Sequence, residues 1–144
     1  MMVINDILKT EEFLRSKLLH AYIDCFRVYS IELQVNFLKQ TDTEIQSCWL
    51  SVMEGITVTD SSEGISDSGN VLTSLHGLIG DKVGSVEILA NGSLSIAFGS
   101  KVLKVFSDEP NFEMVWKVTP ETPEPYAKHP WSVTFTDRSE LVIN

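Results

Sequence analysis

The sequence predicts an α+β fold: a curved antiparallel β-sheet with two short helices packed on it. The first observation is the alternation of apolar and polar residues over 29–37, which is the two-residue period of a half-buried strand. The second is Asn91-Gly92, a strong hairpin signal between two further alternating runs. The third is a pair of segments, 10–17 and 70–79, with capping residues and helical spacing of apolar residues. With 144 residues and 43% hydrophobic content, we expect a single domain over residues 1–144.

The two helices are predicted from their caps and their spacing. In the first, Thr10 is the expected N-cap and Glu11 follows it in the first turn, where a negative charge is favoured. In the second, Asn70 is the expected cap and Gly80 the expected end. The apolar residues of the second helix recur at helical spacing: Val71, Leu72, Leu75, Leu78 and Ile79.

The other segments predict strands, turns and one long loop. Ile45, Trp49 and Met53 share one face of the alternating run 44–53, and core packing is the expected role of this tryptophan and of Trp116 and Trp131. A hairpin of the Asn-Gly type leads us to expect positive φ at both turn residues, 91 and 92. Residues 60–70 are nearly all turn formers or acids and predict a long loop. The prolines of 120–130 predict an extended arm, not a central strand.

The two halves of the chain look alike, which predicts a duplicated unit of one helix and three strands. The units span residues 10–59 and 70–118, and a closing hairpin follows at 130–143. The match aligns 14–18 with 79–83, and 30–37 with 93–98. We expect both units to contribute to one sheet.

Few residues point to catalysis, a cofactor or a metal. No nucleophile elbow, cysteine-protease signature or glycine-rich phosphate loop occurs, so we expect a protein that is not an enzyme and that takes no cofactor. Cys25 and Cys48 lie in strand-like runs and are expected to be buried thiols. The three histidines are scattered, and the acids of 60–67 lack the spacing of a calcium loop, so no metal site is predicted.

The charge distribution gives the main functional hypothesis. The chain has a net charge of −9, and residues 40–81 contain no lysine or arginine. Such an acidic surface attracts a basic protein and opposes binding of nucleic acid. A solvated face with no specific partner is the alternative interpretation. The expected contact residues are the acids of this window together with one apolar anchor: Asp42, Glu44, Glu54, Asp60, Glu63, Ile65 and Asp67.

The second half of the chain resembles a protein family. The runs GSVEILANGSLSIAF, DEPNFEMVWKV and WSVTFTDRSELVI are similar to segments of a family of small bacterial proteins of unknown function, over about residues 14–143. Phe112 stands where the family tends to have tyrosine, and Ser139 replaces a glycine. The resemblance implies the fold but no activity. Small acidic proteins of this sort are often immunity proteins of bacterial toxin systems.

These observations lead to one function and two alternatives. We expect an acidic cytoplasmic immunity protein that sterically blocks a basic toxin domain, such as a nuclease, without turnover. The cytoplasm is expected because the first thirteen residues lack the pattern of a secretory signal and no apolar run is long enough to span a membrane. One alternative is a small ligand-binding or enzymatic domain with a pocket between sheet and helices. The other is a scaffold that self-associates through a strand edge.

Overall fold

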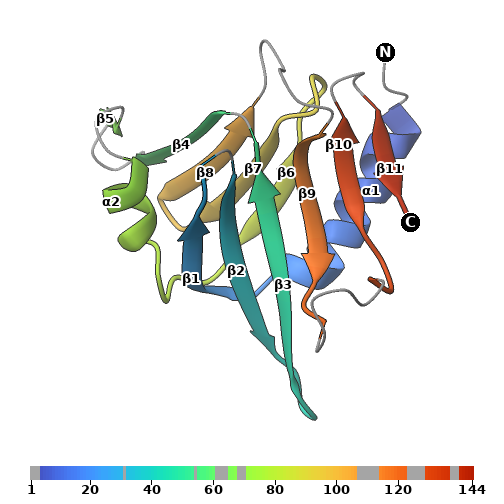
Figure 1. Cartoon of the computed structure of the whole chain (residues 1–144), viewed down its shortest axis with the longest axis horizontal. Coiled ribbons are helices and arrows are strands. Elements are labelled where there is room, and N and C mark those ends of the chain that lie inside the picture. Colours follow the sequence, from blue (N-terminus) through green and yellow to red (C-terminus); the bar gives the residue numbers. More distant parts are fainter. Residues whose placement is uncertain are drawn as a thin grey trace.

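The computed structural model describes residues 4–30, 32–53, 55–60, 65–67, 71–106, 114–122, 129–136 and 140–144. The chain folds into antiparallel strands and two helices, which agrees with the predicted α+β class (Figure 1). The helices are α1 (Ile4–Leu18) and α2 (Val71–His76). The strands are β1 (Tyr22–Val28), β2 (Leu33–Gln40), β3 (Ile45–Val52), β4 (Gly55–Asp60), β5 (Ile65–Asp67), β6 (Ser85–Ile88), β7 (Leu94–Phe98), β8 (Lys101–Phe106), β9 (Met114–Pro120), β10 (Val133–Thr136) and β11 (Leu141–Ile143).

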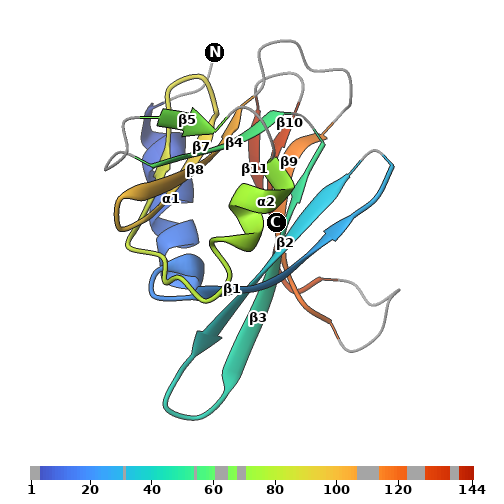
Figure 2. The ribbon, with the colours of Figure 1, turned by 90° about the vertical axis from the view of Figure 1, so that its left-hand side faces the viewer.

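The strands form two sheets, whereas the sequence predicted one. The six-stranded sheet has the order β1-β2-β3-β9-β10-β11, and the five-stranded sheet has the order β5-β4-β8-β7-β6. The chain changes sheet after β3, because β4 pairs with β8, and changes back after β8, because β9 pairs with β3. Figures 1 and 2 show the six-stranded sheet on one side of the molecule, with the five-stranded sheet and both helices on its other side.

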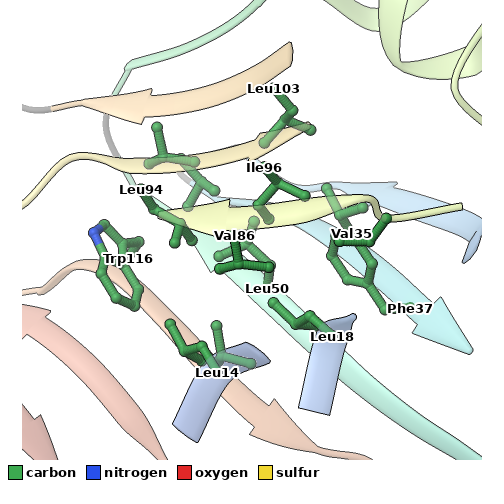
Figure 3. Close-up of a cluster of buried hydrophobic side chains, with 14 of the residues drawn as sticks. Leu14, Leu18, Val35, Phe37, Leu50, Val86, Leu94, Ile96, Leu103 and Trp116 are labelled. Atoms are coloured by element: carbon green, nitrogen blue, oxygen red, sulfur yellow. The ribbon is translucent and has the colours of Figure 1, made fainter. Parts of the chain in front are cut away.

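The core fills the space between the two sheets and α1. Leu14 and Leu18 of α1 meet Phe37 of β2, Leu50 of β3 and residues of β6 to β8, all fully or nearly fully buried (Figure 3). Trp116 of β9 is fully buried, and its indole Nε1 donates a 2.9 Å hydrogen bond to the carbonyl oxygen of Gly92. This bond satisfies the one polar atom of the largest core side chain.

Helix α1 covers the free edge of β6. The carboxylate of Glu11 accepts a 2.9 Å hydrogen bond from the backbone N–H of Ile88, and the Nε of Arg15 donates a 3.1 Å bond to the carbonyl oxygen of Val86. Glu11 and Arg15 also form a 2.8 Å ion pair with each other. Unpaired edge groups would otherwise offer a template for another strand, so these side chains protect the edge of the five-stranded sheet.

Helix α1 begins earlier than the sequence predicted. Thr10 lies inside the helix and its hydroxyl donates to the carbonyl oxygen of Asp6 at 2.7 Å, so it does not cap the N-terminus. This mid-helix bond is the known alternative to capping for a threonine side chain. Helix α2 ends at His76, before the predicted residue 79.

The Asn91-Gly92 turn joins β6 and β7 as predicted, but with different geometry. Gly92 has φ of 88° and Asn91 does not have a positive φ. The N–H of Gly92 donates to Leu89, and the Asn91 side chain accepts from the N–H of Ser93. The loop therefore has a single left-handed residue, as in hairpins longer than two residues. A Cβ at Gly92 would lie 2.1 Å from the ring of Phe135, so a side chain has no room there.

Three strands, β4, β5 and β9, lie where the sequence predicted none. Residues 65–67 form β5 inside the predicted long loop, and their pairing with β4 extends the five-stranded sheet. Strand β9 is central in the six-stranded sheet and ends at Pro120. The predicted closing hairpin is present as β10 and β11.

The predicted duplication has partial counterparts in the topology. Each half contains a helix followed by a three-stranded meander, β1-β2-β3 in one sheet and β6-β7-β8 in the other, and the next strand of each half joins the other sheet. The aligned segments 14–18 and 79–83 differ, however, because the first is helical and the second is not. A common origin of the two halves remains a prediction.

Candidate binding surface on the six-stranded sheet

The outer face of the six-stranded sheet is polar and is not covered by either helix in Figures 1 and 2. Strand register places its side chains in rows, because paired residues of neighbouring strands share a face. The first row consists of Arg27, Gln34, Ser51, Lys117, Thr134 and Val142. The second row consists of Cys25, Asn36, Trp49 and Thr119.

Six residues of these rows form the floor of a groove of about 540 Å³, which we call the outer groove: Arg27, Gln34, Trp49, Ser51, Lys117 and Thr119. Its described lining comes from β1, β2, β3, β9 and the residues after β9: Arg27, Glu32, Gln34, Trp49, Ser51, Lys117, Thr119, Pro120, Glu121, Thr122 and His129. The groove opens on the outside of the sheet. It is therefore not the pocket between sheet and helices that the ligand-binding alternative requires.

Trp49 lines the groove floor and is only partly buried, so its predicted role in core packing is wrong. The guanidinium carbon of Arg27 lies 4.2 Å from the centroid of the Trp49 ring, a cation–π contact. The neighbouring Asn36 is buried and donates to the hydroxyl of Ser47 at 2.8 Å, which fixes the strand beside the indole. An aromatic and an arginine are thereby held together on a face that neither helix covers.

The predicted face of β3 was inverted. Ile45, Trp49 and Met53 were expected to point inward, but Ile45 is 60% exposed and the buried residues are Cys48, Leu50 and Val52. Both faces of this strand carry apolar residues, so alternation alone selects neither. The pairing of Leu50 with Val35 and Val118 decides the face, because all three are fully buried.

The charged residues of the outer groove follow a spatial order. Arg27 and Lys117 lie in the first row, in the middle of the groove. Glu32 precedes β2 at one end of the strands, and Glu121 follows β9 at the opposite end, where its N–H donates to Ser47. Arg27 and Lys117 take part in no ion pair within the described residues. The floor is thus positive and its two ends are negative.

The structure separates the predicted acidic contact residues. Asp42 and Glu44 lie on the β2–β3 turn, at the bottom of Figures 1 and 2. Asp60 ends β4 and pairs with Ile65 of β5, at the top of both views. Asp67 also lies on β5, whereas Glu54 and Glu63 lie outside the described residues. The two described groups therefore occupy opposite ends of the molecule and do not form one continuous face.

One of these two groups borders the outer groove. Glu44 and Glu121 both line a smaller hollow of about 270 Å³ beside the groove, together with Lys17, Cys48 and Trp131. Glu121 lines both hollows. Asp42 lies on the same turn as Glu44, and the side chains of Asp42, Glu44 and Glu121 are all exposed at this end of the six-stranded sheet. We call these three residues the acidic margin.

The two cysteines lie on opposite faces of the six-stranded sheet. Cys25 pairs with Asn36 on the outer face and is half-buried, whereas Cys48 pairs with Phe37 on the inner face and is buried. Both thiols are free. Burial raises the pKa of Cys48 to about 12, and burial together with the nearby Asp24 carboxylate raises the pKa of Cys25. Cys25 is more exposed than the sequence predicted.

Comparisons with known proteins identify no relative of this chain. Neither a family model, nor a curated protein, nor a solved structure matches the chain. The resemblance to small bacterial proteins of unknown function stays a prediction. In the described part of the chain, no group of three or more histidine, cysteine or acidic residues could hold a metal ion, and no helix is long and apolar enough to cross a membrane.

Proposed function

We propose that this protein is an acidic cytoplasmic inhibitor that binds a basic protein domain, such as the nuclease domain of a bacterial toxin, and blocks it sterically. The observation that carries the proposal is the partly buried Trp49 under the Arg27 guanidinium, in an outer groove that neither helix covers. Tryptophan and arginine are the residues most enriched at the energetic centres of protein interfaces. The outer face of the six-stranded sheet is therefore our candidate contact surface.

The acidic margin supports a basic partner. Asp42, Glu44 and Glu121 are exposed at the end of this face, and the chain as a whole carries a net charge of −9. Charges near the contact surface accelerate association with an oppositely charged partner, because the field acts before contact is made. Asp60 and Asp67 lie at the other end of the molecule and contribute only through a field that salt screens over about 8–10 Å.

This function can be tested with a defined partner. The proposal predicts that the gene for this chain follows a gene for a secreted toxin, and the carboxy-terminal domain of that toxin is the protein to purify. Addition of this chain should abolish its activity at a one-to-one ratio without consuming the chain. A toxin domain that stays active in excess of this chain would reject the proposal.

The contact surface is tested by charge reversal. A variant with Asp42, Glu44 and Glu121 replaced by lysine should associate with that domain at least about tenfold more slowly at low salt, and at nearly the wild-type rate in about 1 M salt. The matched control reverses three exposed acids elsewhere, so both variants carry the same net charge. These control residues lie on α1 and β6: Asp6, Glu12 and Glu87.

Equal slowing in both variants would show that net charge matters and the acidic margin does not. Trp49→Ala tests the centre of the surface and should raise the dissociation rate by about a hundredfold or more, as truncation of an interface anchor does. Unfolding curves recorded for each variant separate loss of binding from loss of folding.

A further inference from the structure

The arrangement of charge in the outer groove specifies more about the partner than its overall sign. The chain is acidic, yet two cations, Arg27 and Lys117, occupy the same row of the groove floor and have no ion-pair partner in the described residues. The guanidinium of Arg27 extends across β2 to the ring of Trp49 on β3. Lys117 lies on β9, the next strand beyond β3, and its pairing partner on β3 is Ser51.

The two cations therefore flank one small area of the floor. Hydroxyl groups of Ser51 and Thr119 lie in the same area, and both residues are nearly buried. Guanidinium and ammonium groups beside hydroxyls form a set of hydrogen-bond donors suited to an oxyanion. A partner that covers this floor without a negative group would leave two cations desolvated and unpaired, which is strongly unfavourable.

We propose that the partner inserts one carboxylate between Arg27 and Lys117, and that basic side chains around this carboxylate meet Glu32 and Glu121 at the two ends of the groove. This inference rests on the proposed function, since it places the central contact of the same surface. An acidic residue within a basic surface is the complementary pattern to a positive floor with negative ends.

A phosphate group fits this arrangement less well. It carries up to two negative charges, and the acids at both ends of the groove oppose a multiply charged or nucleic acid ligand. A carboxylate carries one charge and can be held by an arginine and a lysine together. The neighbouring glutamates then favour a carboxylate on a positively charged scaffold over a free anion.

Peptides test the groove without the partner. The probe is acetyl-Lys-Asp-Lys-amide, the neutral-centre control is acetyl-Lys-Asn-Lys-amide, and inorganic phosphate is the third ligand. Nuclear magnetic resonance follows the indole N–H of Trp49, which lies in the groove, and that of Trp116, which lies in the core. We expect the aspartate peptide to shift only the Trp49 signal and to bind at least about tenfold more tightly than the asparagine peptide or phosphate.

Two variants show whether the cations are responsible. Lys117→Gln should weaken the aspartate peptide about tenfold and leave the asparagine peptide unchanged. The control Lys104→Gln removes a half-buried lysine from β8, in the other sheet, and should change neither affinity. Unchanged spectra away from the groove verify that both variants fold.

The outcomes separate this inference from the proposed function. No saturable shift of Trp49 up to roughly 10 mM peptide, equal binding of the two peptides, tighter binding of phosphate, or an effect of Lys104→Gln equal to that of Lys117→Gln would overturn the carboxylate site. The association experiment with the toxin domain does not depend on any of these results. A groove that prefers the aspartate peptide, in a protein that does not block the toxin domain, would uphold the site and reject the inhibitor.

Discussion

The protection of the β6 edge by Glu11 yields a quantitative prediction. Glu11→Ala removes the carboxylate that accepts from the N–H of Ile88 at 2.9 Å, and it removes the ion pair with Arg15 at 2.8 Å. A hydrogen bond to a charged group contributes about 1.5–3 kcal/mol. The ion pair contributes about 0.5 kcal/mol at most, because the Arg15 side chain is 46% exposed. We expect a loss of about 2–3 kcal/mol in the free energy of unfolding.

Two further variants divide this loss between its causes. Glu11→Gln keeps an acceptor for Ile88 and loses the ion pair, so it should cost only about 1 kcal/mol. Glu12→Ala changes the adjacent, exposed glutamate of the same helix and should stay within about 0.5 kcal/mol of the wild type. Urea unfolding measures all three, and the alanine variant at position 11 should also melt about 5–10 °C lower.

The edge itself provides an independent measurement. Amide exchange at Ile88 should accelerate in Glu11→Ala more than at the central strand residue Ile96, because Ile88 loses its partner while Ile96 keeps the pairing of β7 with its neighbours. A Glu11→Gln variant as unstable as Glu11→Ala would show that charge, not the hydrogen bond, stabilises the contact. An effect of Glu11→Ala no larger than that of Glu12→Ala would refute the reasoning altogether.

Three other predictions follow from the fold. Gly92→Ala should lower the free energy of unfolding by about 3 kcal/mol or more, because the new Cβ would lie 2.1 Å from the Phe135 ring and the backbone φ of 88° disfavours a side chain. Calorimetry should show a lower melting temperature, and an unchanged one would contradict this. Burial raises the pKa of Cys48 from 9.0 to about 12, so the stability contributed by its neutral thiol is complete below pH 9 and is lost as the pH rises toward 12, by up to roughly 4 kcal/mol. The free energy of unfolding of Cys48→Ala should therefore fall less steeply with pH over that range than that of the wild type. Parallel curves of unfolding free energy against pH for the two proteins would contradict this prediction. Trp116→Ala should lower the free energy of unfolding by about 3–5 kcal/mol and Trp49→Ala by about 1 kcal/mol, because the Trp116 ring is fully buried and the Trp49 ring is not. Equal losses of stability in denaturant unfolding would contradict the assignment of Trp49 to the surface.

Most residues of the candidate site could not be predicted from the sequence. The acidic window drew attention to Asp42 and Glu44, which lie beside the outer groove, and equally to Asp60 and Asp67, which lie at the other end. Residues that are contiguous in sequence here lie far apart in space, because the chain leaves the six-stranded sheet after β3 and β4 joins the five-stranded sheet. The groove residues come from β1, β2 and β3, which are consecutive in the chain, and from β9, which is distant from them in sequence. The one available signal was Trp49, whose strand has apolar residues on both faces.

Local chemistry in the sequence alone determined the antiparallel β-rich class, the two helices, the closing hairpin and the turn at Gly92. Each depends on residues within one turn or one strand, where spacing and backbone preference suffice. Tertiary structure alone decided the division into two sheets, the central position of β9 and the face on which Trp49 lies. A strand with apolar residues on both faces has no preferred side until its neighbours bury one of them, and here the fully buried Val35 and Val118 beside Leu50 turn Trp49 outward to Arg27.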